Sequence, residues 1–93
     1  MTLTIQYTGQ LANQLGTFRE AIEVESGMRL RAVIDWIVAS HGPEVRQLFF
    51  DAQGGLSATL LVIFDGEQID GDRASREVSG VRELMFMSPI AGG

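Results

Sequence analysis

The chain has 93 residues, enough for one domain, and 45% of them are hydrophobic while 20% are charged, as in ordinary globular proteins. It contains no cysteine and a single histidine, His41, which excludes disulfides, thiolate chemistry and zinc sites built from histidines. The net charge of −5 disfavours nucleic-acid binding and favours docking on a basic protein surface.

The first element expected in chain order is a strand over residues 2–8. Its side chains alternate, with Leu3, Ile5 and Tyr7 on one face and polar residues on the other, which is typical of a half-buried strand. Residues 9–17, "GQLANQLGT", have glycines near both ends and a polar middle. We interpret them as a turn region.

A second strand is expected over residues 18–25, where apolar and acidic side chains alternate again. The neighbouring apolar residues Ala21 and Ile22 shift this alternation by one position, which predicts a bulge or a late strand start. The two strands, joined by a short connection, predict an N-terminal hairpin.

The period then changes to that of a helix, which we expect over residues 28–41. The apolar stripe consists of Leu30, Val33, Ile34, Ile37 and Val38. Ser26 is the expected N-cap, and Gly42 followed by Pro43 is expected to end the helix.

The second half of the chain predicts a short helical turn and a loop over residues 43–58, followed by a strand with apolar side chains on both faces. Asp65-Gly66 is a hairpin turn signal, and it leads into a short return strand. A polar loop then precedes the last strand, over residues 82–90, in which Leu84 and Phe86 share one face.

This element order predicts an α+β fold in which one main helix packs on one face of a mixed sheet of four to five strands. The helix that follows the first hairpin requires a crossover, and we expect the first and last strands to lie side by side and parallel. Residues 1–93 are expected to form a single domain with a flexible tail over about 89–93.

Several patterns resemble catalytic or metal sites but lack the required spacing. His41 has no marked Ser or Asp partner, and we interpret it as a cation near the end of the helix dipole. The acidic stretch "DGEQIDGD" has Ile69 where a third calcium ligand would stand, so no metal site is expected.

Met85 and Met87 alternate with the core residues of the last strand, so they are expected on the open face of the sheet. Methionine adapts to different partners, which makes these two residues candidates for a docking patch. The alternative is that they are isolated surface methionines.

The sequence closes on "SPIAGG", in which Gly92 and Gly93 have no side chains that could pack. A tail without function is one interpretation. The other is that the Gly93 carboxylate is itself the functional group, activated as an acyl-adenylate and attacked by a nucleophile. The missing Cβ of Gly93 would leave the carbonyl open, and that of Gly92 would keep the tail narrow.

The terminal "PIAGG", together with the hairpin, the helix and the "FDGEQI" turn, resembles the MoaD/ThiS family of sulfur carriers, and MoaD most of all. The resemblance covers the whole chain and implies a β-grasp, ubiquitin-like fold. It implies that an E1-like (MoeB/ThiF-type) enzyme uses ATP to adenylate Gly93, which then becomes a thiocarboxylate. The chain itself would bind no cofactor.

The family further implies docking through Met85 and Met87 and through the tail residues Pro89, Ile90 and Ala91. The implied sulfur acceptor is an enzyme such as the molybdopterin synthase large subunit, with this chain as the small subunit. Cysteine, thiamine and thiolated tRNA are the other products considered.

Two other functions stay open: a ubiquitin-like protein modifier and a plain interaction domain. The first ten residues lack the features of a signal peptide, and no apolar stretch is long enough to span a membrane. We therefore expect a cytoplasmic protein that binds neither membranes nor nucleic acid.

Overall fold

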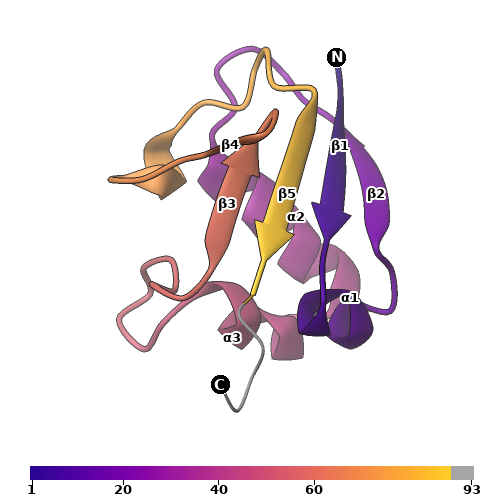
Figure 1. Cartoon of the computed structure of the whole chain (residues 1–93), viewed down its shortest axis with the longest axis vertical. Coiled ribbons are helices and arrows are strands. Elements are labelled where there is room, and N and C mark those ends of the chain that lie inside the picture. Colours follow the sequence, from indigo (N-terminus) through magenta and orange to yellow (C-terminus); the bar gives the residue numbers. More distant parts are fainter. Residues whose placement is uncertain (89–93) are drawn as a thin grey trace.

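The computed structural model describes residues 1–88; residues 89–93 lie outside the described part of the chain. Its five strands are β1 (Thr2–Tyr7), β2 (Arg19–Glu23), β3 (Leu61–Phe64), β4 (Glu67–Gln68) and β5 (Glu83–Met87). They form one sheet in the order β2-β1-β5-β3-β4 (Figure 1). β1 and β5 are parallel and adjacent, while the other neighbouring pairs are antiparallel. The predicted mixed sheet, with its first and last strands side by side, is confirmed.

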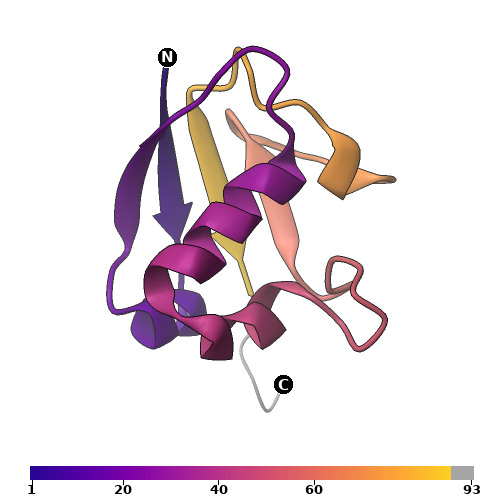
Figure 2. The same cartoon turned by 180° about the vertical axis from the view of Figure 1, so that it is seen from behind.

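Helix α2 (Leu30–His41) crosses one face of this sheet and leaves the other face open (Figure 2). The predicted stripe is the packed face, because Leu30, Val33, Ile34 and Ile37 are fully buried. They share one buried cluster with the core-facing side chains of β1 and β5, among them Ile5 of β1. The α+β architecture with one main helix is thus confirmed.

The two ends of α2 have different determinants. At the start, Arg29 and not Ser26 is the N-cap, and no side chain caps the helix. The Leu30 amide instead donates to the Arg76 carbonyl at 2.8 Å, so the polar loop before β5 satisfies one of the free amides at the start of the helix. At the other end, Gly42 is confirmed as the cap, with φ at 112° and its amide bonded to the Val38 carbonyl at 2.9 Å.

Residues 9–17, expected to be a turn, contain the helix α1 (Gln10–Leu15). Leu11 and Leu15 stand four residues apart on its inner face and are buried. Gly16 ends the helix in the left-handed region, at φ 75°, and its amide bonds to the Ala12 carbonyl. The turn interpretation was wrong because it overlooked a short helical signal in this polar segment. The signal consists of two leucines four residues apart, followed by a glycine that ends the helix.

Of the bulge or late strand start expected in β2, the bulge is absent, since β1 and β2 pair in continuous register from Thr2 opposite Glu23 to Gln6 opposite Arg19. The strand begins at Arg19, one residue later than expected. The two faces of β2 alternate regularly because Glu20, although polar, lies with Ile22 on the core-facing side of the strand. Its carboxylate is held there by two partners described below.

The rest of the chain follows the predicted order. A 3-10 turn η1 (Pro43–Val45) and the short helix α3 (Arg46–Phe49) precede the loop that leads to β3. Asp65 and Gly66, with φ at 48° and 88°, form the predicted hairpin turn between β3 and β4. A second 3-10 turn, η2 (Arg73–Ser75), lies in the polar loop before β5.

Candidate docking face and C-terminal tail

The open face of the sheet carries an apolar band on two neighbouring strands. Met85 of β5 lies opposite Ile63 of β3, and Met87 lies opposite Leu61. Residues directly opposite each other share a face of the sheet, so these four side chains form one continuous group. All four are half-buried.

The phase of β5 is as expected from its sequence. Leu84 and Phe86 are fully buried on the α2 side, and the two methionines alternate with them on the open side. The open face is directed toward the viewer in Figure 1, with α2 behind the sheet.

Sequence analysis did not place Leu61 and Ile63 in this band, because every residue of their strand is apolar. Such a run predicts a strand but gives no phase, so it does not say which side chains face the helix. The register with β5 decides it, since Val62 pairs with Phe86 in the core and its two neighbours therefore point outward.

A polar border runs along the β1 side of the apolar band. Gln6 stands opposite Met85 and donates to the carboxylate of Glu83 at 3.3 Å. Arg19 of β2 reaches the same carboxylate at 3.8 Å. An apolar centre with a polar rim is the composition of a protein-docking surface.

The base of the tail is fixed by aromatic packing around Phe86. Tyr7 stacks on Phe86 with ring centroids 6.2 Å apart, and Phe49 meets it edge-on at 5.2 Å. The Thr8 amide also donates to the Phe86 carbonyl at 3.3 Å. β5 therefore delivers the chain at a defined point, at the end of the molecule where α1 and α3 lie (Figure 1).

The residues expected to carry the chemistry, Gly92 and Gly93, and the docking residues Pro89, Ile90 and Ala91 lie outside the described residues. Their roles stay predictions. From the fixed end of β5, five residues can reach at most roughly 16–18 Å.

A polar cluster joins β1, β2 and α2 within the same end of the domain. Oε2 of Glu20 accepts a hydrogen bond from the Tyr7 hydroxyl at 2.6 Å and lies 2.8 Å from Nε2 of His41, the last residue of α2. Burial, reinforced by the Glu20 carboxylate, raises the pKa of Tyr7 far above its ordinary value, so the hydroxyl keeps its proton. The cluster is a structural link between three elements and supplies no nucleophile.

Neither a metal-binding cluster nor a membrane-spanning helix is found within residues 1–88. That part of the chain contains no group of three or more His, Cys, Asp or Glu side chains arranged to hold a metal ion. None of its helices has the length and apolarity needed to cross a membrane.

A mixed sheet with its first and last strands parallel at the centre and one main helix across one face defines a β-grasp, ubiquitin-like protein. The chain belongs to the ThiS family, whose model matches residues 5–93. It is thus a β-grasp protein of the sulfur-carrier or ubiquitin-like kind.

Solved structures with this fold include SAMP1 from Haloferax volcanii, with a TM-score of 0.81, 22% identity and full coverage of both chains. A putative molybdopterin converting factor subunit 1 from Pyrococcus furiosus superposes with a TM-score of 0.69 and 16% identity, over 97% of this chain and 99% of that one. The small archaeal modifier protein 1 of Methanosarcina acetivorans gives 0.70 and 14%, over 99% and 96%. No curated protein sequence matched the chain. At these identities the structural likeness establishes the fold.

Proposed function

We propose that this protein is a sulfur carrier whose Gly93 carboxylate is converted to a thiocarboxylate. The observation that carries the proposal is that β5 connects the apolar band of the open face directly to the C-terminal tail. Met85 and Met87 belong to the apolar band on the open face, which we propose for docking, and Ser88 alone separates this strand from the predicted tail. The match to the ThiS family, which extends to residue 93, supports the same conclusion.

The activation requires ATP and an E1-like (MoeB/ThiF-type) partner, since the chain offers no nucleotide motif of its own. An oxygen of the Gly93 carboxylate attacks the α-phosphate of ATP, pyrophosphate leaves, and an acyl-adenylate forms. Sulfide from a donor then attacks the carbonyl carbon, AMP leaves, and the thiocarboxylate forms. The partner supplies the catalytic groups, and the chain supplies an unhindered glycine carbonyl.

Docking on the activating enzyme would use the apolar band of Leu61, Ile63, Met85 and Met87. Half-buried aliphatic and thioether side chains adapt to a partner surface at low cost. The tail residues 89–91 would then guide Gly93 into the active site of the partner. Because the base of the tail is rigid, docking determines where the carboxylate arrives.

For the sulfur acceptor we favour molybdopterin synthesis, with this chain as the small subunit of the synthase and a large subunit as its partner. The likeness to the Pyrococcus furiosus protein, whose title names a molybdopterin converting factor, supports this choice. Cysteine, thiamine and tRNA thiolation are the alternatives that the same chemistry would serve.

A second candidate, protein modification through Gly93, is favoured by the likeness to two small archaeal modifier proteins. In that case a lysine of a target replaces the sulfur donor as the nucleophile. The seven basic residues of this chain are all arginines, so it could not form side-chain-linked polymers of itself.

The experiment combines the purified chain, a MoeB/ThiF-type enzyme, ATP and a sulfide donor, followed by intact-mass measurement. A sulfur carrier gains the mass difference between sulfur and oxygen, and fragmentation places it on Gly93. Deleting Gly93 moves the carboxylate back by up to about 3.5 Å and abolishes the reaction, since a misplacement of ~1 Å can cost ~100-fold. An unmodified wild-type chain, or a deletion variant that reacts equally well, contradicts the proposal. Conjugates with target lysines in place of thiocarboxylate would support the modifier.

A further inference from the structure

Strand β2 forms one edge of the sheet, and its outer side is uncovered. The strand order places β1 on one side of β2 and no strand on the other. Figures 1 and 2 show no other element of the described chain along this outer side. Such an edge presents backbone amides and carbonyls that can pair with a further strand.

The backbone groups that β2 offers at this edge follow from its pairing with β1. Hydrogen-bonding groups alternate between the two sides of an antiparallel strand. The Phe18 carbonyl accepts from the Tyr7 amide at 3.0 Å, and the Val24 amide donates to the Met1 carbonyl at 2.8 Å, so both point toward β1. Residues an odd number of positions from these two point outward. They are Arg19, Ala21 and Glu23.

The charges of β2 match those of a second copy in one antiparallel register. Residues that point outward must face each other across the new pair. When Ala21 faces Ala21 of the second copy, Arg19 faces Glu23 on both sides of the two-fold axis, as an isologous interface requires. The other registers of these three residues set like charges opposite each other or set a charge opposite alanine.

Both charged side chains are available for such a contact. Arg19 and Glu23 stand on the open face of the sheet, and their side chains are 56% and 76% exposed. Arg19 reaches the carboxylate of Glu83 only at 3.8 Å. Glu23 accepts from the Thr2 hydroxyl and lies 3.6 Å from the N-terminal amine. A carboxylate has about four acceptor positions, so these contacts leave room for a guanidinium.

Phe18 adds apolar surface at the same edge. Its side chain is 70% exposed, although it directly precedes β2. In the register centred on Ala21, Phe18 lies opposite Val24 and diagonally across from Ile22 of the second copy, within reach of an aromatic side chain. The pairing would therefore cover Phe18 at both ends of the interface.

Thr17 limits how tightly this edge can pair. Its hydroxyl donates to the Arg19 carbonyl at 3.0 Å and accepts from the Arg19 amide at 3.3 Å. Both outward groups of Arg19 thus have a local partner that a second copy must displace. We expect the association to be weak and reversible for this reason.

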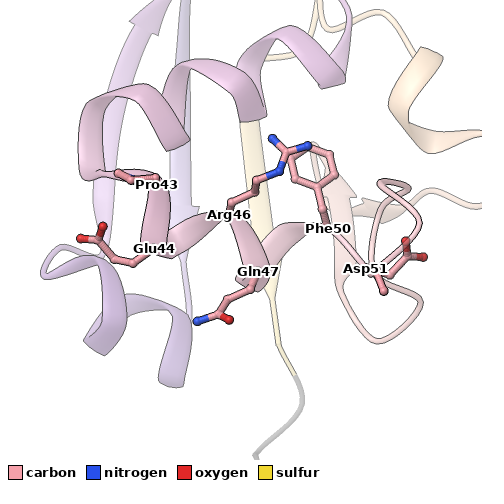
Figure 3. Close-up of a pocket in the computed structure, with 7 residues that line it drawn as sticks. Pro43, Glu44, Arg46, Gln47, Phe50 and Asp51 are labelled. Carbon is pink, nitrogen blue, oxygen red and sulfur yellow. The ribbon is translucent and has the colours of Figure 1, made fainter.

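The groove beside α3 has no comparable pattern of charge (Figure 3). The guanidinium of its single cation, Arg46, lies 4.6 Å from the centroid of the Phe50 ring, which it shares with Arg31 at the same distance. Two carboxylates, those of Glu44 and Asp51, line the same groove. This mixture favours no class of ligand, whereas the edge of β2 is complementary to itself.

We propose that the protein self-associates through β2, in an antiparallel pair centred on Ala21 that joins two five-stranded sheets into one. Arg19 of each copy binds Glu23 of the other. The apolar band on β3 and β5 stays accessible in this dimer, because β1 separates it from β2. The proposal is independent of the chemistry at Gly93.

The test is sedimentation velocity of the full chain over a roughly 100-fold range of concentration, in which a reversible dimer should appear as the concentration rises. Arg19→Glu sets acids opposite acids, and Glu23→Arg sets arginines opposite arginines. Each should weaken self-association about 10-fold. An equal mixture of the two variants restores opposite charges at both positions, so it should form a mixed dimer. Arg82→Glu is the matched control, because it makes the same charge change at an exposed position away from β2.

Two further measurements locate the contact. Exchange of the Ala21 amide with solvent should slow as the dimer forms, because this amide gains a hydrogen-bond acceptor. Thr17→Val should tighten the dimer, since it removes the hydroxyl that competes for the backbone of Arg19.

Several results would overturn the proposal. They are a wild type that stays monomeric, a mixture of the two charge variants that does not associate, and a dimer in which the Ala21 amide exchanges as fast as in the monomer. If that exchange slows only when the activating enzyme is added, the edge pairs with a strand of the enzyme and not with a second copy.

Discussion

Met85 of β5 and Ile63 of β3 are direct cross-strand partners on the open face of the sheet, and they form the centre of its apolar band. Neither residue takes part in the core, which is formed on the opposite face by Phe86 and Val62. The same two strands therefore serve stability on one face and carry an apolar band on the other, which we propose as the docking surface.

An acid introduced into this band should disrupt docking without unfolding the domain. We expect Met87→Glu and Ile63→Glu to weaken binding to the activating enzyme by roughly 30-fold or more, the loss typical of residues central to an interface. Calorimetric titration measures the affinity, and thermal unfolding checks the fold. Ala21→Glu is the control, because Ala21 is exposed on the same face but lies on the edge strand β2. If the stability falls while the affinity is unchanged, the band is structural.

Phe86 should be among the residues on which stability depends most. Its ring is fully buried between Tyr7 and Phe49, so Phe86→Ala removes both aromatic contacts and leaves a cavity. We expect the free energy of unfolding to fall by about 3–5 kcal/mol, with a smaller loss for Phe86→Leu. Urea denaturation followed by circular dichroism measures both. A loss under about 1 kcal/mol for the alanine variant would show that the site collapses around the missing ring.

Tyr7 is the single tyrosine of the chain, so tyrosinate absorbance reports on it alone. Its pKa is raised in the folded state above the ordinary value of 10.0. Below pH 10 both states are protonated and stability does not depend on this group. Above pH 10 the unfolded state releases the proton and the folded state does not, so stability falls by up to about 1.4 kcal/mol per pH unit.

Tyrosinate should therefore appear only when the protein unfolds, and Tyr7→Phe should lack this alkaline loss of stability. The variant also removes the hydrogen bond to Glu20, which should cost about 1 kcal/mol near neutral pH. Absorbance titration with parallel chemical denaturation from about pH 8 to pH 11 provides the measurement. A tyrosine that ionises near pH 10 in the folded protein would contradict the expectation.

Gly42 should tolerate alanine poorly. Its φ of 112° lies outside the range favoured by residues with a Cβ, and an added Cβ would stand 2.7 Å from Oε1 of Glu44. We expect Gly42→Ala to lower the free energy of unfolding by more than about 1 kcal/mol. Gly55→Ala is the matched control, because its backbone is unstrained and its nearest contact would be an ordinary 3.7 Å to Asp51. Equal effects in the two variants would show that the cap geometry is not limiting.

Much of the fold could be predicted from local patterns. The alternation of Leu3, Ile5 and Tyr7 and the stripe along α2 were sufficient because each element has one buried face. The same reasoning placed Met85 and Met87 on the open face of β5. The Asp65-Gly66 turn followed from its chemistry, since few other dipeptides adopt its backbone angles.

The features that local patterns did not predict share a cause, since each depends on a contact with a distant part of the chain. α1 has six residues, which are too few for a helix to be stable alone. It forms because Leu11 and Leu15 pack into the core. Glu20 occupies a core-facing position in β2 because Tyr7 and His41 meet its carboxylate. Arg29 stands at the N-cap position in place of Ser26, and the backbone of the loop before β5 satisfies the Leu30 amide.

The sequence by itself determined the elements with a single buried face, the order of those elements and the family to which the chain belongs. The tertiary structure alone decided which residues of β3 join the apolar band and which arginines share Phe50. Every side chain of that strand is apolar, and Arg31 and Arg46 belong to different helices, so no local period links them to their partners. The spacing of apolar residues reveals which face of one helix or strand is buried. A surface shared by several elements is instead determined by strand register and by packing between elements.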